Sequence, residues 1–484
     1  MKRLTGWDAF LLYSETPNVH QHTLKIAVVD TAQFEGPPTF DAFRETFRSR
    51  LWILDPLRYE LVDVPLRLHR PMWREDAEID LDYHLRRVTV PAPGGRAGLD
   101  ALVGEIAGTP LDHRRPLWRL YYAEGLADDR VAVIGKVHHA LADGIASANL
   151  MARAMEWPDV AHPEHAVPRA VAPPGAVELL RNAGRDHLRQ LRELPAAVRD
   201  GVAGIYRLQW HARHRLRDPD LARPFKPPPT FLNRRISAGR AFATATLSLD
   251  EVKAASRCLA VTINDLVLAI AAGGLRRLLL DRDGHADEAL IAEVPAATDI
   301  SPDRIAGNKL STMLVSLPVQ LDDPLARVRL IQTATRIAKE DNELLGPETV
   351  SRFLQYVPAA AVRLTFNWTS RRHGPNQLFN VIVSNVPGPR HRGRIAGAVV
   401  TEIYSVGPLA AGSAMNVTVW SYVDQLNISV LCDDRAFDDV HEATEAFIGA
   451  FAEIRRAAGL GGTTTNVATA LPQAVGPRRE RGLA

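Results

Sequence analysis

The stretch His138-His139-Ala140-Leu141-Ala142-Asp143-Gly144 follows an apolar, strand-like run at residues 131–137 and precedes a helix-like run at residues 145–157. A strand, a short loop containing Asp and Gly, and then a helix are typical of a catalytic turn. Side chains alternate between the two faces of a strand, so the two histidines cannot easily share one site. We expect one histidine to face the chemistry and the other, His138, to face packing or solvent.

His139 adjoins the loop and is the candidate general base, because a neutral imidazole can accept a proton from a hydroxyl or amine near neutral pH. Asp143 is expected to hold the turn rather than the proton, by pairing with an arginine. Gly144 is expected to let the backbone leave the turn at an angle closed to other residues. The alternative is an ordinary strand-to-helix corner, which the stretch taken alone favours.

The rest of the chain favours the catalytic interpretation over the ordinary corner. H-H-x-x-x-D-G is the form shared by chloramphenicol-acetyltransferase-like acyltransferases and condensation domains. Over about residues 1–455 the chain resembles, block by block, the bacterial wax ester synthase/diacylglycerol acyltransferase family. The matching blocks are Trp7-Asp8-Ala9-Phe10 with His20 and His22, Pro110-Leu111-Asp112, Arg115-Pro116-Leu117-Trp118, Asn264-Asp265, Gly307-Asn308, Ser384-Asn385-Val386-Pro387-Gly388-Pro389, and Asn416-Val417-Thr418-Val419 with Ser421-Tyr422.

One departure from the family pattern follows Ser421-Tyr422. A glycine turn is expected there, and this chain has Val423-Asp424-Gln425 instead. The departure puts the local hairpin in doubt, together with any substrate contact in it.

The resemblance implies an α/β fold with mixed sheets, built as two chloramphenicol-acetyltransferase-like domains with a tunnel between them. We expect an N-terminal domain at residues 1–158, a linker with a basic helix at 159–235, a C-terminal domain at 236–460 and a disordered tail at 461–484. In the second domain, strands are expected near residues 241–249, 289–294, 311–319, 378–383, 415–421 and 426–431.

The resemblance further implies an O-acyltransferase that moves a long-chain acyl group from acyl-CoA to diacylglycerol or to a long-chain alcohol. His139 would take the proton from the acceptor hydroxyl and return it to the departing sulfur. No G-x-S-x-G nucleophile motif is present in the sequence. Acyl-CoA is a substrate here, so no cofactor is expected. The alternatives are a carrier-protein-dependent condensation enzyme and a non-catalytic lipid-droplet-binding protein of the same fold.

Each of the other candidate site residues has a functional and a structural interpretation. Asn264, fixed by Asp265, is a candidate donor to the oxyanion or, equally, the N-cap of a helix at residues 265–280. Ser384 and Asn385 either line the tunnel or make a turn before Pro387, and the turn is favoured. Pro116-Leu117-Trp118 either lines the tunnel or packs behind the site, and packing is favoured.

Composition narrows the class of partner and cofactor. The net charge is +2, which does not favour nucleic acid. Cys258 and Cys432 make neither a disulfide framework nor a zinc site. His113, His138, His139 and Asp143 could be imagined as metal ligands, but no metal-binding spacing supports them, and we expect no metal.

We expect a cytoplasmic protein without a transmembrane anchor. The longest uncharged stretch, residues 403–423, contains Gly, Pro, Ser and Asn and lacks the continuous apolarity of a membrane span. Residues 177–217 look helical, broken at Pro195, and carry nine arginines against four acids. This segment is either a basic amphipathic surface for a membrane or lipid droplet, or a crossover helix with a solvated arginine face, and its position favours the second reading.

Overall fold

The computed structural model describes residues 1–32, 39–155, 175–215, 218–371 and 378–461. The first half of the chain alternates helices and strands because apolar residues recur at both spacings. Its elements are β1 (Lys2–Arg3), α1 (Gly6–Tyr13), β2 (His22–Asp30), α2 (Phe40–Arg50), η1 (Leu51–Ile53), η2 (Asp55–Arg58), β3 (Glu60–Val62), η3 (Pro65–Arg67), β4 (Met72–Arg74), α3 (Leu81–His84), β5 (Leu85–Thr89), α4 (Arg96–Gly108), β6 (Trp118–Leu126), β7 (Arg130–His138) and α5 (Gly144–Ala154).

The second half begins with a long helix and continues as a second α/β unit. Its elements are α6 (Ala176–His214), β8 (Arg240–Ser248), α7 (Leu249–Leu259), α8 (Ile263–Arg282), β9 (Leu290–Ala297), β10 (Leu310–Leu317), α9 (Pro324–Leu345), α10 (Thr349–Leu354), α11 (Ala359–Arg371), β11 (Val381–Val386), β12 (Arg394–Ile395), β13 (Ala398–Val406), β14 (Met415–Tyr422), β15 (Gln425–Asp433) and α12 (His441–Ala457). The six strands predicted for the second domain are confirmed as β8, β9, β10, β11, β14 and β15.

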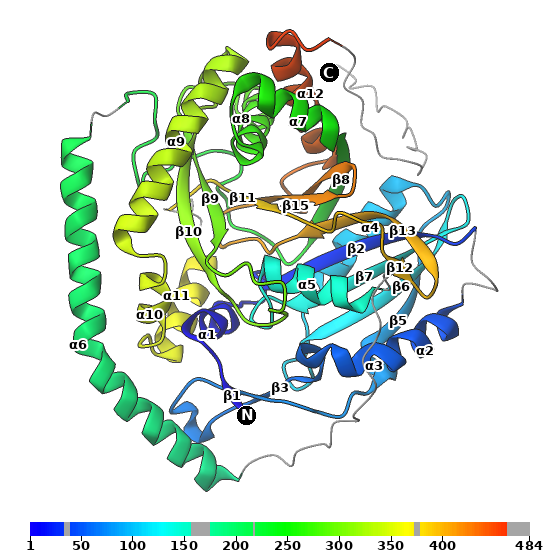
Figure 1. Cartoon of the computed structure of the whole chain (residues 1–484), viewed down its shortest axis with the longest axis vertical. Coiled ribbons are helices and arrows are strands. Elements are labelled where there is room, and N and C mark those ends of the chain that lie inside the picture. The colour runs from blue at the N-terminus through cyan, green and yellow to red at the C-terminus, as the bar shows by residue number, and fades with distance from the viewer. Residues whose placement is uncertain (33–38, 156–174, 216–217, 372–377, 462–484) are drawn as a thin grey trace.

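Two six-stranded mixed sheets form the frame of the molecule (Figure 1). The first has the order β12-β13-β2-β7-β6-β5, and the second has the order β10-β9-β11-β14-β15-β8. A small third sheet has the order β1-β4-β3. The mixed α/β class is therefore confirmed.

The first sheet is completed by strands from the second half of the chain. β13 pairs antiparallel with β2, from Val399 opposite Asp30 to Val406 opposite Leu24. The assignment of all of residues 236–460 to a separate second domain is therefore corrected, because β12 and β13 belong to the first sheet.

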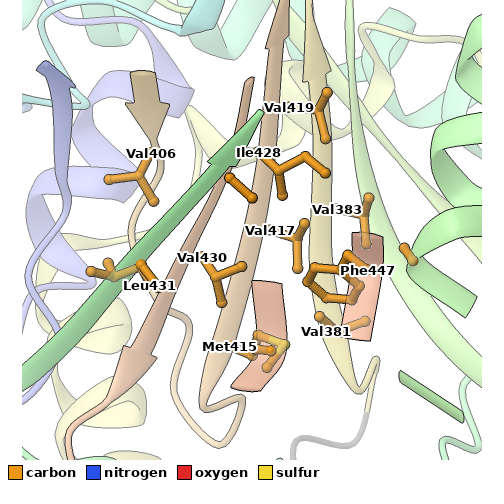
Figure 2. Close-up of a cluster of buried hydrophobic side chains, with 14 of the residues drawn as sticks. Val381, Val383, Val406, Met415, Val417, Val419, Ile428, Val430, Leu431 and Phe447 are labelled. Atoms are coloured by element: carbon orange, nitrogen blue, oxygen red, sulfur yellow. The ribbon is translucent and has the colours of Figure 1, made fainter. Parts of the chain in front are cut away.

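One face of the second sheet carries its hydrophobic core. Val381, Val383 and Val417 gather around Phe447 of α12, together with Met415 (Figure 2). Helix α8 comes close to α12 because Gly274 has no side chain; a Cβ atom there would lie 2.1 Å from the ring of Phe447. The sheet is therefore held rigid from this side by packed helices.

Helix α4 joins the two sheets through one face. Arg96, Asp100 and Gly104 are spaced four residues apart and so lie above one another on the helix. Buried Arg96 forms an ion pair with the fully buried Glu402 of β13. Asp100 accepts hydrogen bonds from the backbone N–H and the hydroxyl of Thr244 on β8, at 3.0 and 2.9 Å. These contacts set the position of one half against the other.

One local prediction is wrong, and the hairpin that the missing glycine put in doubt is present. Helix α6 runs unbroken through Pro195, whose exposed side chain places the lost hydrogen bond on the solvent side, where water can replace it. The hairpin after Tyr422 forms without glycine: Tyr422 pairs with Gln425, and Val423 adopts a left-handed conformation with φ 55°.

No single helix among the described residues combines the length and apolarity needed to cross a membrane; one bent pair, α7 with α8, meets the criteria only when its two helices are combined. The uncharged stretch at residues 403–423 lies mainly in β13 and β14. The predicted disordered tail, apart from residue 461, lies outside the described residues, as does most of the loop before α6.

His441, the first residue of α12, should make stability depend on pH. Its ring bonds Asp100 at 3.1 Å and Asp439 at 2.8 Å, and the bond to Asp100 above all raises its pKa to about 9. Because the folded-state pKa lies above the unfolded value of about 6.5, the stabilisation is complete below pH 6.5 and is lost as the pH rises through 9. We expect His441→Gln to lower the free energy of unfolding by on the order of 1–2 kcal/mol at pH 6, discounted for the partly exposed ring.

Urea unfolding at a series of pH values measures this difference. The gap between wild type and His441→Gln should shrink toward pH 9.5, while His285→Gln, an exposed histidine, should show no such trend. A gap that is constant with pH would contradict the assignment.

Candidate active site

The two histidines of the central stretch meet different surroundings, as predicted. His138 ends β7 and is fully buried; its Nδ1 accepts the N–H of Ala140 at 3.0 Å, and its Nε2 lies 3.3 Å from Glu15. His139 is half-buried, and its backbone N–H donates to Gln21 at 2.7 Å. Only His139 is directed toward the segment that follows β9.

Asn308 fixes the tautomer of His139. Its amide Nδ2 donates to Asp8 and to the backbone carbonyl of His139, both at 2.8 Å. A carbonyl can only accept, so Oδ1 is the atom that faces the ring. Oδ1 lies 3.0 Å from Nδ1 of His139, and this nitrogen must therefore carry the proton. The lone pair is left on Nε2, the arrangement that a general base requires.

Electrostatics also favour the neutral ring. Burial lowers the pKa of His139 below its usual value of 6.5, and the negative charge of Asp143 opposes this shift without cancelling it. A hydrogen bond from the ring to Asn308 acts in the same direction as Asp143. At neutral pH the imidazole is thus mainly neutral, with one proton on Nδ1, and Nε2 can accept a second one.

Asp143 holds the turn, as predicted, and pairs with an arginine. It is the N-cap of α5 and accepts the N–H of Ala146 at 2.9 Å. It also accepts the backbone N–H of Lys309 at 2.8 Å, and both its oxygens bond to Arg304, at 3.0 and 2.9 Å. These contacts use the carboxylate fully, so its role is structural: it ties residues 304–309 to the central stretch.

The prediction that Gly144 adopts a backbone angle closed to other residues is wrong. Its φ is not positive; it is the first residue of α5. A Cβ atom there would lie 3.2 Å from a methyl group of Val386, so glycine allows the end of β11 to approach. The left-handed position is Gly307, with φ +76°, which donates its N–H to Leu141 at 2.7 Å.

Asn264 and Asp265 do not interact as predicted. Helix α8 begins at Ile263 with Thr262 as its N-cap, so Asn264 lies within the first turn rather than at the cap. Asp265 completes a capping box with Thr262 and accepts the hydroxyl of Thr335 at 2.6 Å. The hydrogen bonds of the described residues place Asn308, not Asn264, against His139.

The other tunnel candidates lie either within a strand or in the packed interior. Ser384 and Asn385 lie inside β11 and are half-buried, so the expected turn begins only after Val386. Pro116, Leu117 and Trp118 are buried, and the indole N–H of Trp118 donates to Leu57 at 2.6 Å. These three side chains are therefore packed in the interior, and their place in a tunnel wall stays a prediction.

Glu15 gathers histidines behind the candidate base. Its carboxylate lies 2.7 Å from His113, 3.3 Å from His138 and 3.5 Å from His22, and these neighbours lower its pKa far below the usual range. The cluster has the composition of a metal site. However, Nδ1 of His138 accepts an N–H, so Nε2 must carry a proton and cannot be a metal ligand. His139 and Asp143 are not members of this cluster.

A cavity of about 350 Å³ lies beside the site. Asn308 and Lys309 form part of its wall, together with Trp7 of α1, Gln190 of α6 and Arg352 of α10. The cavity thus reaches the residue that orients His139, while His139 itself is not in its lining. The tunnel through the molecule stays a prediction.

Three residues of the site were not identified from the sequence as functional. Asn308 and Asp8 lie within the blocks Gly307-Asn308 and Trp7-Asp8-Ala9-Phe10, which carried the resemblance but no assigned role. Arg304 precedes the first of these by three residues and had no signal beyond the arginine that Asp143 was expected to bind.

Comparison with known proteins adds to this geometry. Residues 4–267 match the wax ester synthase/diacylglycerol acyltransferase catalytic domain, and residues 306–455 match the WS/DGAT C-terminal domain. A protein of Mycobacterium tuberculosis (strain ATCC 25618 / H37Rv) named "Putative diacyglycerol O-acyltransferase" is 54% identical over 476 residues, covering 98% of this chain and 100% of the relative. A second one from the same strain is 33% identical over 463 residues, covering 94% and 90%.

Solved structures show the same fold. The wax ester synthase/diacylglycerol acyltransferase from Marinobacter aquaeolei VT8 aligns with a TM-score of 0.65 at 25% identity, covering 95% of this chain and all of that one. The first condensation domain of the calcium-dependent antibiotic synthetase aligns with a TM-score of 0.58 at 15% identity, covering 96% and 97%. The predicted chloramphenicol-acetyltransferase-like architecture of two domains is confirmed by these alignments.

The tautomer of His139 can be checked by ¹⁵N NMR of histidine-labelled protein, with its signals assigned by their loss in His139→Gln. We expect a proton on Nδ1 and a pKa below 6.5. Asn308→Asp should raise that pKa, because a carboxylate against the ring favours the charged form. Asn308→Leu serves as the control that removes the hydrogen bond without adding charge. A proton found on Nε2 in the wild type would contradict the assignment.

Removing the partner of Asp143 should destabilise the fold. Arg304→Met leaves a buried carboxylate without its cation, and we expect a loss of roughly 3 kcal/mol in the free energy of unfolding. Arg44→Gln breaks a partly exposed ion pair with Asp82 and should cost less than about 1 kcal/mol. Chemical denaturation measures the loss of unfolding free energy in both variants. Equal losses would show that the Asp143–Arg304 pair contributes no more to stability than the Arg44–Asp82 pair.

Proposed function

Because the chain belongs to the wax ester synthase/diacylglycerol acyltransferase family, we propose that it transfers a long-chain fatty acyl group from acyl-CoA to the hydroxyl of diacylglycerol, of a long-chain alcohol, or of both. The observation that carries this proposal is the free Nε2 of His139, maintained by the hydrogen bond of Nδ1 to Asn308. A lipid-binding protein without catalysis has no use for this arrangement. The family match favours acyl-CoA over a carrier protein as the donor.

In the proposed reaction, Nε2 of His139 accepts the proton of the acceptor hydroxyl as its oxygen attacks the thioester carbonyl. The carbon–oxygen bond forms and a tetrahedral oxyanion results. The carbon–sulfur bond then breaks, and the protonated imidazole returns the proton to the departing sulfur. Asn308 keeps the ring in the required tautomer throughout, and Asp143 keeps Asn308 in place through the backbone of Lys309.

The oxyanion needs a hydrogen-bond donor. Asn264 keeps this role as a proposal. Its half-buried side chain lies in the first turn of α8, where the positive end of the helix dipole favours negative charge. Asp265 does not orient it, so any such contact forms with substrate rather than within the free protein.

We further propose that the enzyme acts from the cytoplasm on acceptors held at the surface of a membrane or lipid droplet. Diacylglycerol and long-chain alcohols partition into lipid, since each buried methylene contributes about 0.8 kcal/mol. The enzyme must therefore meet the acceptor at a lipid boundary while acyl-CoA arrives from water.

The assay combines labelled long-chain acyl-CoA with each acceptor in turn. We expect His139→Ala to reduce ester formation by roughly 10²- to 10⁴-fold, the range for loss of a general base. His285→Gln, at an exposed histidine outside the site, is the matched control and should retain full activity. Similar turnover by wild type and His139→Ala would remove His139 as the base.

The pH profile supplies an independent check. The reaction needs the neutral imidazole, so the rate should fall as the pH drops through the lowered pKa of His139, below 6.5. Asn308→Asp should move this acid limb to higher pH. An acid limb unaffected by that change would indicate a different titrating group.

A further inference from the structure

Helix α6 runs along one edge of the molecule, outside the two sheets (Figure 1). Its inner face is narrow and built from small or sparsely spaced residues, which allows close packing against α9 and α10. A Cβ atom at Gly204 would lie 2.6 Å from the carbonyl oxygen of Leu345, so the helix is held tightly. The buried inner positions are Leu179, Ala183, Gln190, Ala197, Gly201 and Gly204.

The outer face of α6 is apolar although it is exposed. Nine large hydrophobic side chains leave between 40% and 70% of their surface uncovered by the described residues. Most of them recur at spacings of three or four residues, or of seven or eight, which is about two turns, so they form one exposed stripe along the helix. A continuous exposed stripe of this size marks an interaction surface. The stripe consists of Val177, Leu180, Leu188, Leu191, Val198, Val202, Ile205, Tyr206 and Trp210.

Arginines follow one edge of this outer stripe. Arg181, Arg185 and Arg192 are exposed, and the ion pairs of the described residues leave them without a carboxylate. The acids of the helix lie away from the stripe, and Asp186 and Asp200 already bond arginines. The outer face therefore combines apolar surface with uncompensated positive charge.

A second element extends this surface near the start of α6. The short turn η3 carries Leu66 and is followed by Leu68, and these side chains are 88% and 53% exposed. It is fastened to the helix because the ring of His187 bonds the carbonyl of Leu68 at 2.8 Å and lies against His69. Two segments that are far apart in the sequence thus expose apolar side chains side by side.

We infer that the outer stripe of α6, with η3, docks on an anionic lipid surface. This inference deepens the proposed function, on which it rests for its biological purpose. A lipid interface offers hydrocarbon to the stripe and phosphate groups to the adjacent guanidinium groups, which bind them bidentately. A second copy of this chain would present the same arginines and no acidic row to meet them, so charge favours lipid as the occupant.

The docked helix lies parallel to the surface. Its 39 residues span about 58 Å, long enough to fix the orientation of the whole molecule. The cavity beside Asn308 has Gln190, on the inner face of α6, in its wall. Docking would therefore hold this cavity one helix diameter from the lipid, on the order of 10 Å.

The test uses the full-length protein and flotation with vesicles of phosphatidylcholine, with or without about 30 mol% phosphatidylglycerol. We expect wild type to bind the anionic vesicles, and Leu191→Glu/Val202→Glu to bind at least about tenfold more weakly. Arg185→Gln/Arg192→Gln should lose the preference for anionic lipid. Leu364→Glu, an equally exposed leucine on α11, is the matched control and should bind like wild type.

The outcomes separate the alternatives. Absence of wild-type binding to anionic vesicles, or equal loss in the Leu364 control, would overturn the inference. So would sedimentation data in which the stripe variants convert a dimer to a monomer while vesicle binding is unchanged, since the occupant is then a second copy.

Activity distinguishes failure of docking from failure of the proposed function. Leu191→Glu/Val202→Glu should esterify an acceptor dispersed in detergent at the wild-type rate and lose activity toward diacylglycerol in anionic vesicles. Unchanged activity on vesicles would count against docking. If wild type binds vesicles but forms no ester with either acceptor, the docking surface stands and the proposed function fails.

Discussion

The buried carboxylate of Asp143 is the constraint on which the site depends. A carboxylate removed from water is tolerated only when it is paired and hydrogen-bonded, because its desolvation costs several kcal/mol. Here the partners come from both halves of the chain: the first turn of α5 on one side, and Arg304 with the backbone of Lys309 on the other. The segment at residues 304–309 must therefore dock before the charge is satisfied, and Asn308 reaches His139 only as part of that segment. The candidate base is correctly oriented only when the two halves are joined.

The local part of the site could be predicted from the sequence, and the long-range part could not. His139 and Asp143 lie within five residues, so strand alternation and helix capping suffice to assign their directions. Asn308 lies 169 residues from His139, and no local pattern links them. Gly144 shows the same limit: the glycine is required by Val386, which approaches from another sheet. The sequence led us to expect an unusual backbone angle at Gly144. The glycine is needed instead because a side chain there would collide with Val386.

The fold divides in the same way. The six strands of the second sheet follow from apolar runs bounded by turn residues, and all were predicted. β13 was missed because its membership of the first sheet is decided by pairing with β2, more than 370 residues earlier in the chain. Asn264 was offered as the N-cap of α8 because the capping box of Thr262 and Asp265 was not considered. Pro195 was weighted as a helix breaker, although a proline on the solvent side of a long helix can be accommodated.

The strand exchange also governs when the molecule can form during synthesis. The chain emerges from the ribosome N-terminus first, and domains usually fold as they appear. β2 would then wait with one edge open, its backbone N–H and C=O groups unpaired, until residues 394–406 are made. An open edge of this kind invites pairing with other chains. The first sheet can close only near the end of translation, so about the first 390 residues must be kept from aggregating until β12 and β13 are made. A separately produced first half would lack these two strands of its sheet, whereas the second sheet lies wholly in the second half.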